Sequence, residues 1–166
     1  MTGQPRRSLE GMKLPRVTVT NSRPGGGDAV YLCDLVGVGR HVIVGLPDAS
    51  ASIFNGHEIP ELLMRADVLM RSGVRSINCV VSSRPQAVQT WRRSVDPDER
   101  LRFFADPGLD FSRALDLVYE VPSDACAMRS RRFMLMVDNG VIAGARVEAT
   151  ARDFDFGDTD VVLLAV

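Results

Sequence analysis

The sequence is poor in the residues that usually carry redox and metal chemistry. It contains 3 cysteines, 2 histidines and 1 tryptophan among 166 residues. An odd number of cysteines without paired spacing argues against an exported, disulfide-linked scaffold and favours the reducing cytoplasm, which is the location we expect. The two histidines, His41 and His57, are too few for a histidine-based metal centre, so no metal and no other cofactor is predicted.

The chain also lacks one-sided charge and long apolar segments. Lysine and arginine together number 20 against 21 aspartate and glutamate, and the net charge is −1. Without a block of like charges, neither nucleic acid nor an anionic membrane is predicted as a partner. The sequence has no apolar run long enough for a spanning helix, and residues 1–11 lack the apolar core of a secretory signal.

The composition is that of an ordinary globular protein, with 45% hydrophobic and 25% charged residues. A chain of this length is expected to fold as one domain that buries roughly 70% of the surface of the unfolded chain. Residues 1–14 are polar, and we expect them to form a flexible N-terminal segment. Residues 15–166 are predicted to form the single domain.

Hydrophobic spacing predicts alternating strands and helices. Val42 to Leu46 and Ile77 to Val81 are continuous apolar runs, typical of central strands covered on both faces. An apolar stripe at helical spacing follows the first run, and it contains Ile59, Leu62, Leu63, Ala66, Leu69 and Met70. Asn139-Gly140 between apolar runs predicts a hairpin, and residues 158–166 resemble a capped helix. The predicted class is α/β, with a mixed sheet sandwiched by helices.

The loop after the first central strand carries the most information. Gly45 to Pro60 joins that strand to the helix and resembles the active-site loop of the peroxiredoxins, whose pattern is Pro-x-x-x-Thr-x-x-Cys. Pro47 matches the proline, whereas Ala51 stands at the threonine position and Phe54 at the cysteine position. The resemblance therefore implies a peroxiredoxin fold without the reactive groups of a peroxiredoxin.

Later segments resemble the type-5 (atypical two-cysteine) branch of the family in order and spacing. They are Gly73 to Val81, Ala87 to Trp91, Phe104-Ala105-Asp106-Pro107, Arg131-Arg132-Phe133 and Val137 to Val141. The resemblance implies a thioredoxin-like architecture and a homodimer formed through the face that carries the loop. Apolar Leu46 and Ile53 are expected near that contact.

A thiol peroxidase needs a thiolate at a helix N-terminus, an arginine beside it and a threonine that orients the peroxide. Of these groups, the resemblance assigns only the arginine, to Arg132. The resolving cysteine of type-5 members would fall near residues 154–158, where the sequence has none. Arg132 is expected either to pair with Glu58 or to face a ligand.

The cysteines that are present stand elsewhere. Cys79 lies within a predicted central strand and Cys33 near a predicted edge, so both are interpreted as structural. Cys126 lies in a predicted loop close to Arg129, Arg131 and Arg132, which would favour its thiolate. It is the one candidate for a relocated redox cysteine.

The loop offers polar groups for other chemistry. The predicted pocket comprises Pro47, Ser50, Ala51, Ser52, Phe54 and Arg132. His57 is the candidate general base because its ordinary pKa is near neutrality, although an exposed histidine in a first helical turn is the simpler interpretation. Neither serine lies in a nucleophile elbow. The aspartates between residues 153 and 160 lack the spacing of a calcium loop and are interpreted as a solvated turn.

Three functions are compatible with these residues. In the first, the former peroxidase pocket binds, and in an enzyme transforms, a small organic carboxylate without a thiol. In the second, the protein is a non-catalytic binding or scaffold protein that keeps the fold for its contacts. In the third, Cys126 serves a relocated thiol peroxidase. Because fold alone does not determine function, the sequence does not separate the first two.

Overall fold

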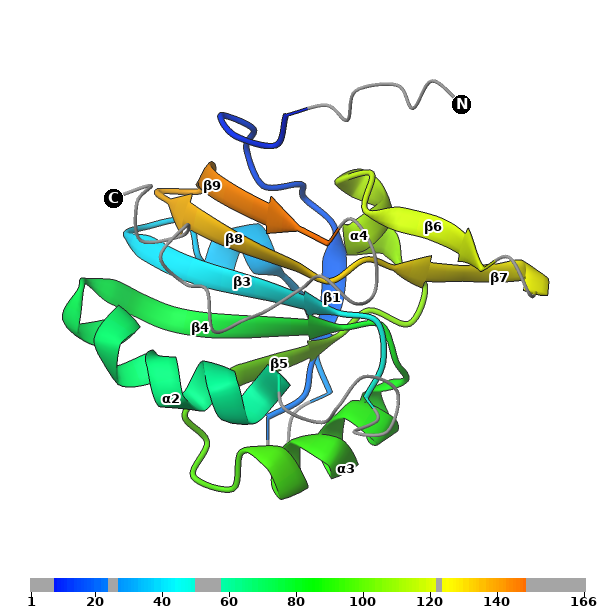
Figure 1. Ribbon diagram of the computed structural model, residues 1–166, viewed down its shortest axis with the longest axis horizontal. Helices are drawn as coiled ribbons and strands as arrows, with labels where there is room; N and C mark the ends of the chain where they lie inside the picture. The colour runs from blue at the N-terminus through cyan, green and yellow to red at the C-terminus, as the bar shows by residue number, and fades with distance from the viewer. Residues whose placement is uncertain (1–7, 24–26, 50–57, 122–123, 149–166) are drawn as a thin grey trace.

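The computed structural model describes residues 8–23, 27–49, 58–121 and 124–148. In this part of the chain one seven-stranded sheet has the order β2-β1-β5-β4-β3-β8-β9, and β6 and β7 form a separate two-stranded sheet (Figure 1). The strands are β1 (Thr18–Asn21), β2 (Ala29–Tyr31), β3 (Arg40–Leu46), β4 (Val74–Val81), β5 (Arg102–Ala105), β6 (Val118–Val121), β7 (Asp124–Ser130), β8 (Phe133–Asp138) and β9 (Val141–Val147). The helices are α1 (Leu32–Leu35), α2 (Glu58–Arg71), α3 (Pro85–Val95) and α4 (Asp110–Ala114).

The two predicted central strands form the middle of the large sheet, as expected. β3 pairs in parallel with β4, and β4 in parallel with β5. β8 pairs antiparallel with the other edge of β3. The sheet is therefore mixed, and the predicted α/β class is confirmed. β3 and β4 lie inside the sheet, and their apolar runs are buried on both faces because α2 and α3 cover one face and α1, α4 and the N-terminal segment cover the other.

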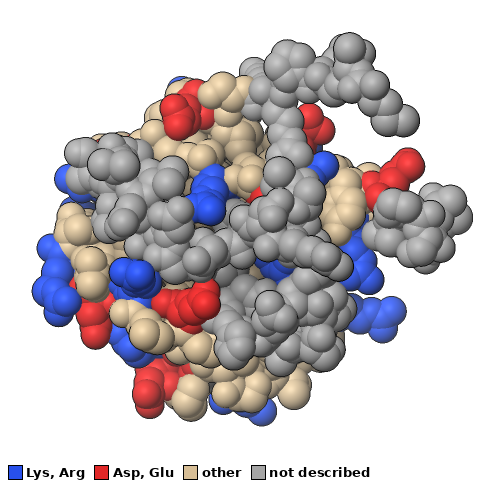
Figure 2. All heavy atoms as spheres, viewed as in Figure 1, with Lys and Arg blue, Asp and Glu red and all other residues tan. Residues whose placement is uncertain are grey.

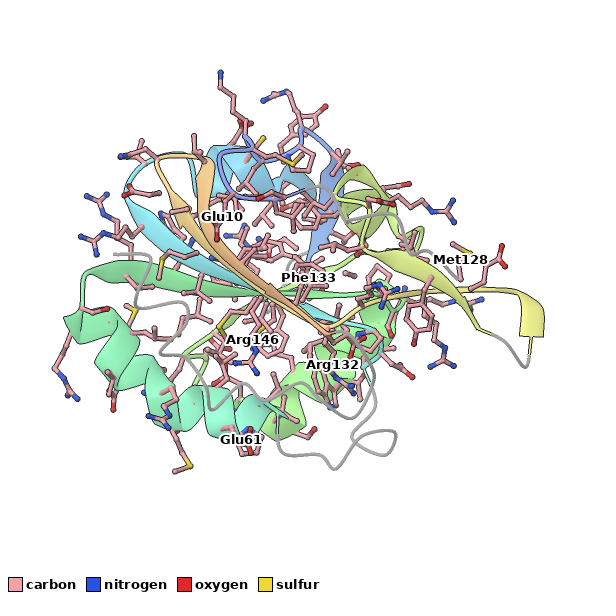
Figure 3. The ribbon with its side chains drawn as sticks, turned by 45° about the horizontal axis from the view of Figure 1, so that its top comes forward. Glu10, Glu61, Met128, Arg132, Phe133 and Arg146 are labelled. Carbon is pink, nitrogen blue, oxygen red and sulfur yellow. The ribbon has the colours of Figure 1, made fainter. Side chains whose placement is uncertain are left out.

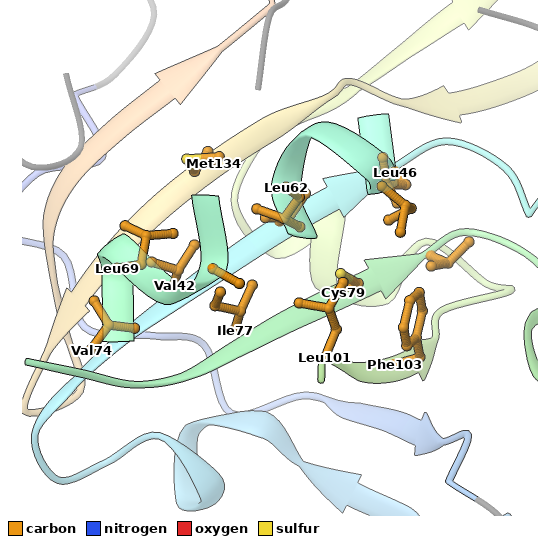
Figure 4. Packing of buried hydrophobic residues seen from close by; sticks show 14 of the residues in the cluster. Val42, Leu46, Leu62, Leu69, Val74, Ile77, Cys79, Leu101, Phe103 and Met134 are labelled. Atoms are coloured by element: carbon orange, nitrogen blue, oxygen red, sulfur yellow. The ribbon is translucent and has the colours of Figure 1, made fainter. Parts of the chain in front are cut away.

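Helices α2 and α3 cover one face of this sheet (Figure 1). The apolar stripe of α2 points at the sheet, with Leu62 and Leu69 fully buried against Val42 (Figure 4). Met70 was predicted to belong to the stripe, but this prediction is wrong, because 48% of its surface is exposed. At the end of the stripe the helix turns Met70 away from the sheet.

The opposite face packs against α1, α4 and the N-terminal segment. Its core contains Ile43 of β3, Phe111 of α4 and Phe133 of β8. Leu9 and Leu14 are buried in the same cluster.

Backbone hydrogen bonds join the N-terminal segment to β9 and its turn, from Gly11 N–H to Ile142 O at 2.8 Å and from Leu14 N–H to Gly140 O at 3.0 Å. The described part of the predicted flexible segment is therefore attached to the domain. The packed region begins by Leu9, earlier than the expected boundary at residue 15.

The hairpin between β8 and β9 is confirmed at the predicted dipeptide. Asn139 has φ 49° and Gly140 has φ 79°, the two positive values that a type I′ turn requires. The predicted C-terminal helix over residues 158–166 lies outside the described residues. None of the helices in the described ranges is long and apolar enough to cross a membrane. Basic and acidic side chains are interspersed on the face shown in Figure 2.

Candidate functional site

The site predicted from the loop lies at the carboxyl ends of β3 and β4, where open α/β sheets commonly bind ligands. Gly45, just before the end of β3, is paired with Phe133 of β8. A Cβ at position 45 would stand 2.0 Å from the Phe133 ring, so the ring lies directly against the glycine backbone. The glycine thus permits the close approach of β8 to the strand that leads into the loop.

The chain leaving β3 is tied to the chain leaving β4. Ala49 N–H donates to Ser83 Oγ at 3.0 Å, and the Ser83 hydroxyl donates to Asp48 Oδ1 at 3.1 Å. Ser82 N–H donates to Leu46 O at 3.0 Å. These bonds fix the direction in which the loop leaves the sheet, beginning at half-buried Pro47. Sequence reasoning missed Ser83, since only the parallel pairing of the strands brings it beside Asp48.

Most of the predicted loop residues cannot be placed by this geometry. Ser50, Ala51, Ser52, Phe54 and His57 lie outside the described residues. Their predicted roles therefore remain predictions. Glu58 begins α2, but its side chain is also outside the described part, so the expected alternative of an Arg132–Glu58 pair stays open.

Arg132 has a carboxylate partner that the sequence did not predict. Its backbone N–H donates to Glu148 Oε1 at 2.8 Å, and its Nη1 lies 3.5 Å from Glu148 Oε2. Both residues are 4% exposed. Phe133 pairs with Val147 across the hairpin, so Arg132 and Glu148 stand opposite each other just beyond the paired strands. An ion pair so thoroughly removed from water requires both partners, because either charge alone would be costly to bury.

Burial governs the protonation of this carboxyl group. Removal from water raises the pKa of Glu148 above its ordinary value of 4.5, and the hydrogen bond and positive charge of Arg132 only partly oppose that rise. The site therefore contains a carboxyl group that holds its proton more firmly than one in water.

A second arginine lies on the same face. Arg146 of β9 is paired with Met134, whose side chain belongs to the core beneath α2. Figure 3 shows Arg132 and Arg146 on the side of the sheet that carries α2, the helix to which half-buried Glu61 belongs. The described residues thus place the guanidinium groups of Arg132 and Arg146 and the buried carboxyl group of Glu148 on the face of the sheet that carries α2.

The structure describes two cysteine thiols, one fully buried and one half-buried. Cys79 is fully buried in β4, and this burial strongly raises the pKa of its thiol, as expected for a structural cysteine. The Cys33 thiol in α1 donates to Asp34 Oδ1 at 3.8 Å. Cys126 was predicted to lie in a loop, but this prediction is wrong: residue 126 is in strand β7. Its side chain lies outside the described part.

Two further expectations concern metals and contacts. The described residues contain no group of three or more histidine, cysteine, aspartate or glutamate side chains that could hold a metal ion. His41 is buried instead, with Nδ1 2.7 Å from Ser76 Oγ and Nε2 2.8 Å from Val38 O.

Leu46 was expected to be an exposed apolar contact. It is 4% exposed, because it is the last residue of a central strand and packs beneath α2.

The architecture and the loop position can be compared with known proteins. The Redoxin family matches residues 9–163. The chain belongs to the redoxin family. It is 30% identical over 122 residues to the rice (Oryza sativa subsp. japonica) protein "Peroxiredoxin-2F, mitochondrial", covering 74% of this chain and 62% of that one. The chain thus spans about three fifths of that relative's length.

Solved peroxiredoxins have the same fold. The crystal structure of reduced Prx3 from Vibrio vulnificus in complex with hydrogen peroxide has a TM-score of 0.82 at 24% identity, covering 96% of this chain and 99% of that chain. Peroxiredoxin 5 from Alvinella pompejana has a TM-score of 0.76 at 22% identity, covering 96% and 97%. The predicted thioredoxin-like, peroxiredoxin-type fold is therefore confirmed.

Proposed function

We propose that this redoxin is not a thiol peroxidase, and that the pocket formed by the loop after β3 binds a small organic molecule carrying a carboxylate. The observation that carries the proposal is the loop sequence, with Phe54 at the cysteine position and Ala51 at the threonine position. A phenyl ring is no nucleophile, and a methyl group cannot orient a peroxide. In an enzyme with this pocket the chemistry would be acid–base, with His57 moving the proton.

The surroundings of the loop support an anionic ligand. α2 begins at Glu58, directly after the loop, and a helix N-terminus favours a negative group. Arg132 and Arg146 lie on the same side of the sheet as that helix. A guanidinium group binds a carboxylate with two parallel hydrogen bonds. Because Glu148 already supplies one carboxylate to Arg132, the ligand would join an existing ion pair.

The buried ion pair also favours a second candidate function. With both partners 4% exposed, Arg132 and Glu148 can be explained as a structural link between β8 and the end of β9. In that case the protein keeps the redoxin fold as a non-catalytic binding or scaffold protein. The two functions differ in whether replacing Arg132 changes ligand affinity or only stability.

Thermal-shift measurements with paired ligands test the proposal. Small carboxylates such as benzoate are compared with their uncharged amides, since a ligand of the native state raises Tm. We expect carboxylates alone to raise Tm, Arg132→Lys to weaken their binding, and His57→Gln to leave affinity unchanged while abolishing any turnover. Arg131→Lys is the matched control, because the Arg131 guanidinium lies over the Tyr119 ring at 5.3 Å.

The scaffold function would replace the proposal under a different result. If no carboxylate in the panel raises Tm, and Arg132→Lys only lowers the Tm of the free protein, then the pocket is not a ligand site. Arg132→Lys is preferred to an apolar substitution because it keeps a positive charge beside Glu148.

We also propose that two copies of this redoxin pair through the face that carries the loop, as the family resemblance implies. Light scattering coupled to size exclusion should give twice the mass of the 18.2 kDa chain. A monomeric mass at several milligrams per millilitre would refute the homodimer. Because Leu46 is buried within each chain, substitution at position 46 would report on folding rather than on this contact.

A further inference from the structure

A cavity of about 360 Å³ lies along β5, and its lining includes Leu101 and Arg102, Phe103 and Phe104 of that strand. This volume is within the range of small-molecule sites. Its charged lining comes from Arg23 after β1, Arg92 of α3, Glu99 of the following loop and Arg102 of β5. Leu35 and Leu101 contribute apolar surface.

Arg92 is the most unusual residue of this lining. It is 4% exposed, and among the described residues it forms an ion pair from Nη1 to Glu99 Oε1 at 3.3 Å. Its buried Nε–H has no hydrogen-bond partner among the described residues. A buried donor without an acceptor is costly, and a charged one especially so. Arg92 brings its positive charge to the cavity lining, where Glu99 is its ion-pair partner.

The loop between α3 and β5 holds this arrangement in place. Asp96, 1% exposed, accepts hydrogen bonds from Arg100 N–H at 3.0 Å and from Leu101 N–H at 2.8 Å. Glu99 N–H donates to the Asp96 carbonyl at 3.1 Å. These bonds fix Glu99 beside Arg92 and direct the chain into β5. The fold therefore fixes the side of the cavity formed by Arg92 and the loop before β5, whereas Arg23 and Arg102 are exposed side chains.

The charge of the lining indicates the kind of ligand. Three arginines against one glutamate leave two positive charges in excess. Arg23 also lies 3.8 Å from Asp28, but both side chains are more than half exposed, and such surface pairs contribute little. Arginine matches the geometry of phosphate oxygens, and a phosphate monoester carries close to two negative charges near neutral pH. We propose that this cavity binds a small organic phosphate, with the phosphate at the arginines and an apolar group on the leucines.

Titration of the full-length, isotope-labelled protein with phenyl phosphate, followed by amide NMR, tests the proposal. We expect saturable shifts at Leu101, Arg102 and Phe103, and none with phenol at the same concentrations. Exposed Arg102→Gln should raise the Kd by roughly tenfold, as expected for loss of one charge-assisted contact. Arg93→Gln is the matched control, because Arg93 is exposed on α3 and does not line the cavity. Its Kd should equal that of the parent.

Glu99→Gln provides a test with the opposite sign. This change keeps an oxygen acceptor for Arg92 but removes the negative charge facing the phosphate, so the Kd should fall severalfold. The proposal is overturned if phenyl phosphate does not saturate, if phenol binds equally well, or if Arg102→Gln and Arg93→Gln have the same Kd. Shifts confined to residues outside the cavity would overturn it as well.

Discussion

At the scale of single residues, Gly45 allows the ring of Phe133 to lie against the backbone at the end of β3. Gly45→Ala would place a methyl group 2.0 Å from the ring of fully buried Phe133. We expect it to lower the free energy of unfolding by about 1–3 kcal/mol, the usual cost of overpacking a core. Urea denaturation measures this change. In the double variant Gly45→Ala/Phe133→Leu the loss should be smaller than the sum of the two single losses, and simple additivity would contradict the contact.

Glu148 is expected to affect stability in a pH-dependent manner. Its pKa in the folded protein lies above 4.5, so the native state holds this proton more firmly than the unfolded chain does. The stability it contributes is fully present below about pH 4.5 and is lost as the pH rises through the raised pKa. Glu148→Gln lacks this dependence. The stability difference between the parent and Glu148→Gln should therefore shrink as pH rises from 4 to 8.

Urea denaturation of both proteins at each pH measures that difference. A difference that instead grows with pH would mean that attraction to Arg132 outweighs burial and lowers the pKa of Glu148. Arg132→Lys, which keeps the charge, should show the same direction of pH dependence as the parent.

The pairing of Arg132 with Glu148 shows what a single sequence can and cannot predict at this scale. The family motif identified Arg132, and the Asn139-Gly140 turn identified the hairpin. If the strands paired from that turn without a bulge, Val147 would lie opposite Arg132. The structure has a register shift between Met136 and Val137 that moves the pairing by one residue and brings Glu148 there instead. A bulge of this kind leaves no reliable signal in the alternation of side chains.

At the scale of elements, α2 is held by one apolar stripe against the sheet. Leu62 is fully buried on that stripe, whereas Met64, two residues later on the same helix, is 79% exposed. Leu62→Ala should lower the free energy of unfolding by about 2–5 kcal/mol through the cavity it leaves. Met64→Ala, the matched control, should change it by less than about 0.5 kcal/mol. Equal effects in denaturant unfolding would show that the assigned stripe of α2 is wrong.

Long periodic elements were predictable, whereas short ones depend on tertiary context. The start of α4 is an example: aspartate is a typical N-cap, yet Asp110 is already within the helix and the cap position is Leu109, with φ 60°. The Asp106 carboxylate instead accepts hydrogen bonds from Phe111 and Ser112 N–H, each at 3.4 Å. Burial raises the pKa of Asp106, and these backbone donors partly oppose the rise. This cap depends on the turn formed by Pro107 and Gly108. An aspartate at position 110 therefore does not by itself identify the residue that caps α4.

At the scale of the whole molecule, the redoxin fold separates two regions of different chemistry. The carboxyl end of β3 leads into the loop that carries Phe54, and β5 borders the arginine-lined cavity. β4 and β5 are parallel, and Arg102, the first residue of β5, pairs with Asn78 in the middle of β4, so the cavity begins three residues before the carboxyl end of β4. The fold was predictable because apolar periodicity and family motifs indicated the same architecture, whereas contacts between distant segments, such as Ser83 with Asp48, were not.

The most direct test of the account is a thiol-dependent peroxidase assay. The purified protein is supplied with dithiothreitol and either hydrogen peroxide or an alkyl hydroperoxide, and peroxide consumption is followed beside an authentic peroxiredoxin. We predict a rate no higher than that of the protein-free control, because the family resemblance implies Phe54 at the position of the thiolate and Ala51 at that of the orienting hydroxyl. Turnover at the level of the authentic enzyme, lost in Cys126→Ser and kept in Cys33→Ser, would contradict the account and assign the reaction to a cysteine on β7.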